Sequence, residues 1–313
     1  MTSQSTIDLL RHLAGKPGHD EVKADFRQLL IDEFGAELSA LDFERRVPEV
    51  RGRLDALIGR TRSQVISQRA DADNYDCTED EDMKIGIIGA GQIGGTLTRR
   101  LTALGHEVFV ANSRGPETLS ALAVETGATA VPVREAVRGV DLVVVTIPLK
   151  NVASLPADLF AGTPAAVVVV DTCNYYPRQR DGRIEGIEAG LPESRWVEQQ
   201  LGRPVIKAFN NIYARHLMEK GKPAGRTGRI ALPVAGDDAA AKAVVLKLVD
   251  ELGFDGVDTG GLDESWRQQP GTPAYTKDFD VNGVRHALSE ASKNRTPEWR
   301  ATANSPGTFA VPA

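Results

Sequence analysis

Three glycines with a characteristic spacing are the residues of this chain best suited to chemistry. Gly89, Gly91 and Gly94 form the pattern Gly-x-Gly-x-x-Gly. The pattern follows an apolar stretch at 84–88 and opens a helical stretch at 92–104. In that context the first glycine permits a tight turn, the second lets a pyrophosphate approach the backbone, and the third lets strand and helix pack closely. The helix N-terminus adds free N–H groups and the positive end of a dipole.

The end of the second predicted strand decides which dinucleotide such a site holds. An NAD site places Asp or Glu there, about 20 residues after the glycines, where it binds the ribose hydroxyls. This chain has Asn112, Ser113 and Arg114 instead, with no carboxylate to repel a 2′-phosphate. Asn112 and Ser113 can donate hydrogen bonds, and the Arg114 guanidinium can pair with the phosphate. The βαβ unit over 84–114 is therefore expected to hold NADP(H).

Alternating strands and helices must position this unit. Near-continuous runs of Val and Ile are typical of strands buried on both faces, which predicts a mostly parallel sheet with helices on each side. Besides 84–88, strands are expected at 106–112, 129–131, 142–148, 166–174, 204–211, 229–236 and 254–261, with a second long helix at 237–253. The predicted fold class is α/β, a Rossmann-type doubly wound sheet preceded by a small helical or α+β segment.

The first 82 residues differ in charge from the rest. They carry 11 Lys/Arg and 18 Asp/Glu, a net charge of −7, whereas the remaining residues carry 26 and 25, a net charge of +1. Of these 18 acids, 7 lie between Asp71 and Asp82, which predicts a solvated linker. Because Met83 directly precedes the first strand, residues 83–313 are expected to fold and bind NADPH alone. The expected divisions are a partly helical N-terminal appendage at 1–70, an acidic linker at 71–82, the NADP-binding domain at 83–265 and a partly irregular C-terminal extension at 266–313.

Composition excludes several classes of protein. Hydrophobic residues make up 41% and charged residues 26% of the chain, values typical of a soluble globular protein. No stretch approaches the roughly 18 apolar residues of a membrane helix, and the N-terminus lacks the apolar core of a signal peptide. Cys77 and Cys173 provide neither a disulfide framework nor a metal cluster, so a reducing, cytoplasmic location and no metal are expected. No basic face indicates a nucleic acid partner.

Four segments together carry a resemblance to a known family. They are MKIGIIGAGQIGGTLTRRLTALGHEVFVANSR (83–114), DLVVVTIP (141–148), VIKAFNNI (205–212) and LPVAGDDAAAKAVVLKLVDELGFDGVDTGGL (232–262). Their order resembles that of the NADPH-dependent coenzyme F420 reductases over about residues 84–265. The resemblance implies one Rossmann-type domain that holds NADP(H), with the deazaflavin F420 stacked against the nicotinamide. It also implies direct hydride transfer between the two rings, with no catalytic acid or base among the side chains.

The resemblance further implies roles for residues at the ends of several strands. Those expected to hold the cofactor are Gly89, Gly91, Gln92, Ile93 and Gly94 on the pyrophosphate, Ser113 and Arg114 on the 2′-phosphate, and Thr146, Ile147 and Pro148 beside the nicotinamide. Those expected on the second-substrate side are Asn210, Asn211 and Ile212. The family carries a His-Thr pair where this chain has Asn210 and Asn211, and the loops at 173–178 and 264–275 differ as well. The hydride acceptor is therefore left open between F420, a flavin and another small organic oxidant.

Two other functions stay open beside the oxidoreductase. One is an NADP(H)-binding sensor or scaffold without turnover. Its front segment could link it to a DNA-modification system, because residues 1–60 weakly resemble the N-terminal region of DNA methyltransferases and restriction-type nucleases. The segment 60–74 lacks the acid-x-Lys of a nuclease metal site, so no nuclease activity is expected. The other is an imine or β-hydroxyacid reductase, which ranks third because no long amphipathic helix follows Gly261. A homodimer formed through a sheet edge is also considered.

A few further side chains have alternative interpretations. Tyr175 and Tyr176 either stack on a planar acceptor or pack at the surface. Cys173 is expected to be a packed thiol rather than a reactive one. His106 lies in a helix–strand turn and is expected to be structural. His216 follows the predicted strand 204–211 and either reaches the substrate cleft or is structural.

Overall fold

The computed structural model describes residues 82–294, 307 and 309–312. The chain divides into two units, Met1–Glu79 and Asp80–Ala313. The predicted appendage at 1–70 and nearly all of the predicted linker at 71–82 lie outside the described residues, so both remain predictions.

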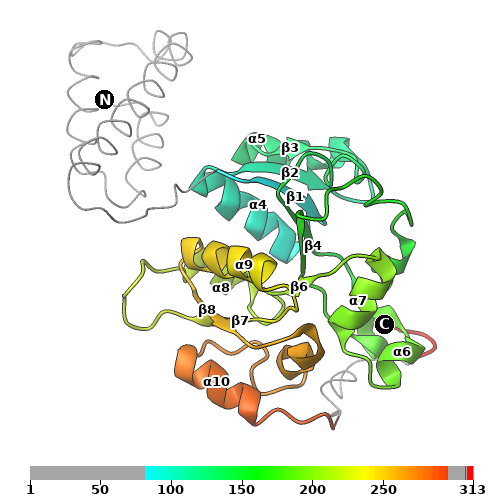
Figure 1. Ribbon diagram of the computed structural model, residues 1–313. Helices are drawn as coiled ribbons and strands as arrows, with labels where there is room; N and C mark the ends of the chain where they lie inside the picture. Colours follow the sequence, from blue (N-terminus) through cyan, green and yellow to red (C-terminus); the bar gives the residue numbers. More distant parts are fainter. Residues whose placement is uncertain (1–81, 295–306, 308, 313) are drawn as a thin grey trace, which may run out of the picture. The chain divides into compact units, whose positions relative to one another are not determined.

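A parallel sheet of six strands forms the centre of the described unit (Figure 1). The strand order is β3-β2-β1-β4-β5-β6, and each neighbouring pair is parallel. In this order β2 and β3 lie on one side of β1, and β4, β5 and β6 lie on the other side, which is the arrangement of the Rossmann fold. The predicted α/β doubly wound class is confirmed. The strands are β1 Lys84–Ile88, β2 Glu107–Ala111, β3 Thr129–Ala130, β4 Leu142–Val145, β5 Val168–Asp171 and β6 Ile206–Lys207.

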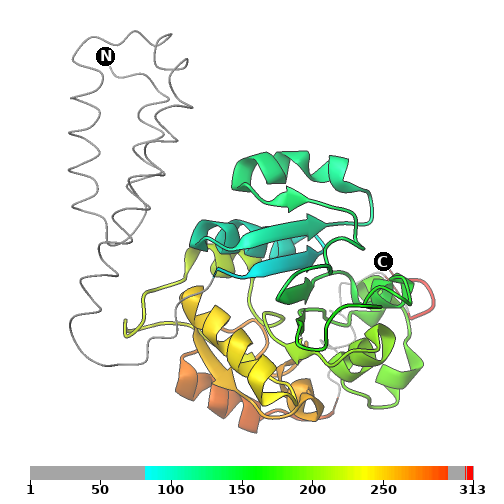
Figure 2. The same cartoon turned by 45° about the horizontal axis from the view of Figure 1, so that its top comes forward.

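Helices cover both faces of the sheet (Figures 1 and 2). Alternation along β4 shows why: Leu142 and Val144 belong to the core cluster that includes residues of α4 and α9, whereas Val143 and Val145 belong to the cluster under η2 and α7. The helices are α4 Gln92–Leu104, α5 Ser120–Thr126, α6 Glu185–Glu188, α7 Glu193–Leu201, α8 Ala214–Glu219, α9 Ala239–Glu251 and α10 Val281–Ser289. The short helical turns are η1 Pro116–Leu119, η2 Leu149–Ser154, η3 Pro177–Asp181 and η4 Leu262–Gln268.

The first helix, α4, begins and ends where the sequence predicts. Leu97 and Leu101 are fully buried against the sheet, one helical turn apart. Gly105 stops the helix with a φ of 104°, and its backbone N–H donates to the carbonyls of Leu101 and Thr102. This is the left-handed cap that glycine adopts most readily.

A second, smaller sheet extends the first. It consists of β7 Ala231–Val234 and β8 Asp255–Asp258, which are parallel, and an antiparallel bridge between Lys207 and Ala235 joins it to β6. Helix α10 packs Val284 and Leu288 on this sheet. Sequence patterns do not indicate α10, because Gly283 lies in its first turn and the stretch before it is rich in Pro and Gly. In the described part of the chain, no helix combines the length and the apolar character needed to cross a membrane.

Candidate functional site

The glycine loop has the geometry that a pyrophosphate site requires. Gly89 has a φ of 113°, which side-chain-bearing residues rarely adopt. A Cβ added to Gly94 would overlap the carbonyl oxygen of Gly89 and lie 2.7 Å from Cγ2 of Thr146, so only glycine lets α4 approach β1 this closely. By contrast, a Cβ at Gly91 would meet no atom within 4 Å. The space above Gly91 is thus open, and the loop fits a phosphate at the N-terminus of α4.

The loop after β2 is ordered by its own asparagine. Asn112 Oδ1 accepts from the backbone N–H of Arg114 at 2.8 Å, and its Nδ2 donates to Thr118 Oγ1 at 2.8 Å. Ser113 and Arg114 are exposed, and no described residue forms a hydrogen bond or ion pair with the Arg114 side chain. Glu117 places its carboxylate against Gly115. The guanidinium is therefore available to a ligand, while Asn112 shapes the turn that presents it.

Residues at the end of β4 lie beneath the glycine loop. The backbone N–H of Thr146 donates to the carbonyl of Ile88 at 2.9 Å, and a Cβ at Gly89 would touch Cγ2 of Ile147 at 2.8 Å. Pro148 then leads into η2. Of the predicted cofactor residues, Gln92 is exposed and Ile93 half-buried. The structure thus brings together the glycine loop and the 146–148 segment at the carboxyl ends of β1 and β4, where open α/β sheets bind their ligands.

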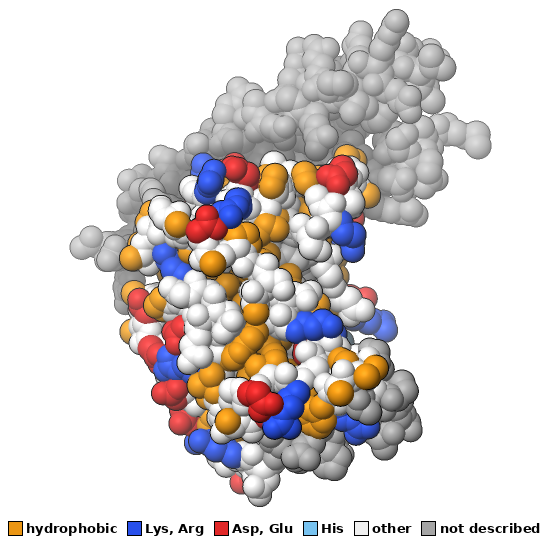
Figure 3. Space-filling view, turned by 90° about the vertical axis from the view of Figure 1, so that its right-hand side faces the viewer, with side chains coloured by type: hydrophobic (Ala, Val, Ile, Leu, Met, Phe, Trp, Pro, Cys, Tyr) orange, Lys and Arg blue, Asp and Glu red, His pale blue; other side chains and the backbone are white. Residues whose placement is uncertain are grey.

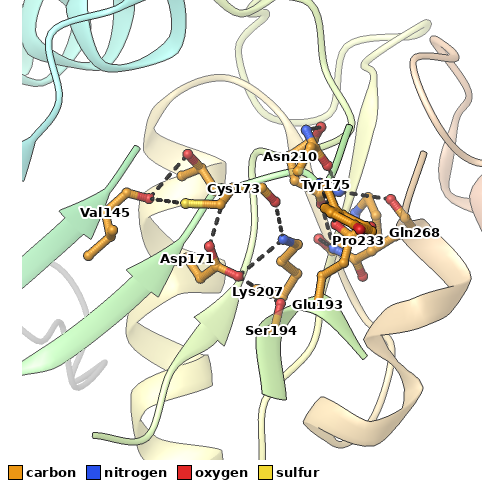
Figure 4. Close-up of polar contacts among 12 residues, drawn as sticks. Val145, Asp171, Cys173, Tyr175, Glu193, Ser194, Lys207, Asn210, Pro233 and Gln268 are labelled. Carbon is orange, nitrogen blue, oxygen red and sulfur yellow. Dashed lines mark hydrogen bonds and ion pairs between the residues drawn. The ribbon is translucent and has the colours of Figure 1, made fainter. Parts of the chain in front are cut away.

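A chain of amides joins the ends of β5 and β6 (Figure 4). Asn210 Nδ2 donates to Asn174 Oδ1 at 3.1 Å and to the Gln268 carbonyl at 2.8 Å, and Asn210 Oδ1 accepts from Gln268 Nε2 at 3.0 Å. Gln268 Nε2 also donates to the Pro233 carbonyl at 3.1 Å. Both hydrogens of the Asn210 amide are engaged, so Asn210 braces this edge of the sheet.

Asn211 contrasts with its neighbour. Its side chain is 1% exposed, and both amide atoms lack a hydrogen-bond partner among the described residues. The main-chain carbonyl of Asn211 accepts a hydrogen bond from the backbone N–H of Thr276 at 2.9 Å. Thr276, the donor in this contact, and Phe209, two residues before Asn211, both have a φ of 57°, an uncommon conformation for residues with a Cβ. Ile212 is buried at 6% exposure. Unpaired polar atoms and strained backbone together are typical of a functional site.

A buried ion pair lies below Asn210 in the view of Figure 4. Lys207 and Asp171, the last residues of β6 and β5, have fully buried side chains and are 3.1 Å apart between Nζ and Oδ2. Lys207 Nζ also donates to the carbonyl oxygen of Cys173. Asp171 accepts from Ser194 Oγ at 2.7 Å and from the backbone N–H of Cys173 at 2.8 Å. All the polar groups of this pair are therefore engaged.

Glu193, the first residue of α7, has a second buried carboxyl group beside this pair. Its Oε2 accepts from the backbone N–H of Tyr175 at 3.1 Å, whereas Oε1 has no partner among the described residues. Burial raises the pKa of Glu193 to about 8, although the Lys207 charge opposes the rise. At neutral pH this carboxyl is thus mostly protonated.

Two tyrosines close the outer edge of the same region. The Tyr176 and Tyr275 hydroxyl groups are hydrogen-bonded, and Arg180 lies over the Tyr176 ring, 5.2 Å from its centroid. Burial raises the pKa of both phenols, so both remain protonated. Tyr175, by contrast, is fully buried and bonds to Glu188 and the Ile184 amide. Of the two tyrosines considered from sequence, Tyr176 lies at the edge of this region and Tyr175 in the core.

Other candidates take structural positions. Cys173 is 3% exposed, and burial raises the pKa of its thiol well above the ordinary value. His106 accepts from the Met83 amide at 3.2 Å and contacts Glu251 at 3.2 Å. His216 pairs with Asp278 at 2.8 Å near the surface. No group of three His, Cys, Asp or Glu residues within the described ranges has the arrangement of a metal site.

Sequence reasoning missed four residues of this region: Lys207, Glu193, Gln268 and Tyr275. For Lys207 the sequence did contain a signal: this lysine interrupts an apolar predicted strand, and Asp171 lies at the end of another. Adjacent ends of parallel strands meet at one edge of the sheet, so this pairing follows once β5 and β6 are known to be neighbours. Figure 3 shows the face of the described unit toward which β1 and β2 point, and the surface of this unit is indented between its upper and lower parts.

Comparison with known proteins identifies the nucleotide-binding segment. The sequence profile of a family described as NADP oxidoreductase, coenzyme F420-dependent, matches residues 84–175. Residues 84–175 belong to this F420-dependent family. The family resemblance inferred from the sequence is confirmed, and it places the segment among Rossmann-fold oxidoreductases that use NAD(P).

Individual relatives match different lengths of this chain. YjhV of Escherichia coli (strain K12) is 46% identical over 91 residues, which are 29% of this chain and 59% of YjhV. The chain thus spans less than two thirds of that relative. The structure of the hypothetical protein SMa0349 of Sinorhizobium meliloti is 30% identical with a TM-score of 0.54, covering 64% of this chain and 97% of SMa0349. A proposed F420-dependent NADP reductase of Arthrobacter sp. FB24 is 25% identical with a TM-score of 0.48, over 59% of this chain and 87% of that protein.

Proposed function

We propose that the chain is an NADP(H)-dependent oxidoreductase that passes hydride directly between the nicotinamide and a flavin-like or deazaflavin partner. The observation that carries the proposal is the glycine loop itself: the space above Gly91 is open, whereas Gly89 and Gly94 of the same loop leave no room for a side chain. The family match over the same residues supports it. NADP(H) supplies the hydride, and the residues of the chain bind and orient the two reactants and exclude water from them.

The preference for NADP(H) rests on the loop after β2. Arg114 is exposed and without a partner among the described residues, and no carboxylate occupies the end of β2. Ser113 lies beside it, and Asn112 holds the turn through Thr118. A guanidinium in this position pairs with a 2′-phosphate through charge-assisted hydrogen bonds. Arg114 is therefore proposed to select NADP(H) over NAD(H).

The acceptor is proposed to bind against the ends of β5 and β6. Asn211 and Glu193 contribute buried polar atoms without partners there, whereas the glycine loop has none. Tyr176 and Tyr275 offer aromatic surface of the kind on which a flat ring system stacks. The proposed acceptor is thus a planar molecule, with F420 favoured by the family and a flavin as the other choice.

The proposal is tested by following the absorbance of NADPH with F420, FMN or a ferric chelate as acceptor. The expected result is oxidation by F420 or FMN, and a rate at least about tenfold lower in Gly91→Ala at subsaturating NADPH, with the fold intact. NADPH binding without oxidation by any of the three acceptors would contradict the proposal and favour a nucleotide sensor. A cytoplasmic location, the absence of a nucleic acid partner and a homodimer remain predictions.

A further inference from the structure

We propose that Lys207 is a positioning residue for the acceptor side of the site: it holds the turn after β5 in place through the Cys173 carbonyl. This inference rests on the proposed function and adds to it a residue that contacts neither substrate. It separates the residues that bind NADPH from those that set the geometry of the acceptor.

Burial of the ammonium group makes a purely stabilising role a poor explanation. The Lys207 side chain is fully buried, as is that of Asp171. Removing two such charges from water costs several kcal/mol each, and apolar side chains of similar size often stabilise a protein as well or better. A buried pair is therefore best explained by the one geometry it enforces.

The third partner of Lys207 shows which geometry that is. Nζ donates to the main-chain carbonyl of Cys173, the second residue after β5. The Cys173 amide is held in turn by Asp171 Oδ1 at 2.8 Å. Both peptide groups of Cys173 are thus bound by the ion pair, and the direction in which the chain leaves β5 is fixed (Figure 4).

The turn held in this way carries the residues that face the acceptor. Asn174 Nδ2 donates to the Asn210 carbonyl at 2.8 Å, and this contact locks the turn to the end of β6. The amides of Tyr175 and Tyr176 donate to Glu193 at 3.1 Å and to Asp181 at 2.7 Å. A shift at Cys173 therefore displaces Asn174 and Tyr176 together.

Lys207 also connects the turn to the second sheet. Its backbone N–H donates to Ala235 at 2.8 Å, and its carbonyl accepts from the Ala235 amide at 3.1 Å. Two residues later, Phe209 adopts a φ of 57° and is fully buried. The chain thus turns sharply just beyond Lys207, and the lysine anchors the straight part before the turn.

A pair of variants separates positioning from stabilisation. Lys207→Met leaves Asp171 as an unpaired buried charge, so it is expected to lower the stability whichever role is correct. The double variant Lys207→Met with Asp171→Asn removes both charges and is expected to regain much of that stability. It does not regain the donor to the Cys173 carbonyl.

Lys242→Met is the matched control. Lys242 is also a buried lysine with one carboxylate, Asp258 at 2.7 Å, and one main-chain carbonyl, Gly260 at 3.1 Å, as partners. These partners belong to β8 and the residues after it, away from the turn after β5. A general effect of losing a buried lysine would therefore appear in this variant too.

Hydrogen exchange of the Tyr175 and Tyr176 amides with NADPH bound is the main measurement, because it requires no turnover. The double variant is expected to exchange both amides about tenfold faster, with the amides of α4 and the affinity for NADPH unchanged. With FMN or F420 as acceptor, kcat/KM should fall by about tenfold to a hundredfold. Exchange like that of the wild type in a stable double variant, or equal acceleration in Lys242→Met, would overturn the inference. If the wild type oxidises NADPH with neither acceptor, the proposed function fails, and the exchange data still decide the role of Lys207.

Discussion

Two halves of the described unit are built in different ways: residues 84–148, proposed to bind the nucleotide (the nucleotide half), and residues 168–276, proposed to bind the acceptor (the acceptor half). The nucleotide half buries no Asp, Glu, Lys or Arg, and its functional loop is shaped by glycines. The acceptor half buries Asp171, Asp181, Glu193, Lys207, Arg229 and Lys242. All the unpaired buried side-chain atoms among the described residues lie in it, as do both non-glycine residues with positive φ, Phe209 and Thr276.

This difference shows how each half specifies its ligand. A dinucleotide is bound largely by backbone N–H groups and a helix dipole, which any sequence with the correct glycines supplies. An acceptor is oriented by side chains from several loops, and buried polar groups enforce one arrangement of those loops at a cost in stability. The first half is thus shaped mainly by backbone geometry, whereas the second is shaped by buried polar side chains.

The largest expected effect is a loss of stability in the nucleotide half when one methyl group is added to Gly94. Gly94→Ala places a Cβ on the Gly89 carbonyl, so the free energy of unfolding should fall by roughly 3 kcal/mol or more, with NADPH binding lost. Urea denaturation and fluorescence titration measure both quantities. Gly91→Ala is the matched control, because its Cβ meets no atom within 4 Å. It should change the stability by less than about 1 kcal/mol and still weaken NADPH binding at least about tenfold. Equal stability of the two variants would contradict the assigned roles of the glycines.

The second prediction concerns the buried carboxyl of Glu193 in the acceptor half. Its pKa rises from 4.5 to about 8 on folding, so between these values the folded chain holds a proton that the unfolded chain releases. Stability should therefore fall as the pH rises through this interval, by up to about 1.4 kcal/mol per pH unit. Urea denaturation across the interval should show a flatter profile in Glu193→Gln. Glu219→Gln, an exposed residue of α8, serves as the control and should keep the slope of the wild type. An unchanged slope in Glu193→Gln would show that this carboxyl is ionised in the folded chain.

A smaller effect sharpens the choice of nucleotide. Arg114→Glu should weaken NADPH relative to NADH by about 1–3 kcal/mol, because a charge-assisted contact to the 2′-phosphate is lost. Fluorescence titration with both nucleotides measures the difference. Arg138→Glu, which alters an exposed arginine paired with Glu135, should leave the preference intact. If Arg114→Glu binds the two nucleotides in the wild-type ratio, Arg114 does not select the cofactor.

The smallest expected effect is an absence of reaction in the acceptor half. In a Cys77→Ser background, Cys173 is the sole remaining thiol. Because Cys173 is 3% exposed and burial raises its pKa, DTNB should modify it only as fast as the chain opens. A stopped-flow comparison with and without urea measures this rate. Rapid modification of the folded chain would identify a reactive cysteine at the end of β5.

The sequence allowed the nucleotide half to be predicted well and the acceptor half only in outline. The predicted helix 92–104 coincides with α4, and the predicted strand 84–88 with β1, because short-range patterns determine both. The predicted strand 204–211 is reduced to Ile206–Lys207, since the chain turns at Phe209. Tyr176 and Tyr275 are 99 residues apart, so their contact depends on how distant loops pack. The prediction that Asn210 and Asn211 lie on the substrate side remains untested.

The bridge between Lys207 and Ala235 has a consequence for the cooperativity of unfolding. Only a pair of backbone hydrogen bonds, of 2.8 and 3.1 Å, continues the hydrogen-bonding pattern from the large sheet into β7. The layer formed by β7, β8 and α10 packs Val257 and Val284 in a small core, whereas Leu232 and Val234 of β7 belong to the large core that also holds residues of β1 and α4. Because β7 is shared between the two cores, the small sheet is expected to open together with the large core and not separately. Opening of β7 would release Gln268 from Pro233 and at the same time expose the core beneath β1 and α4, so the acceptor edge and the Gly89–Gly94 loop are expected to unfold in one transition.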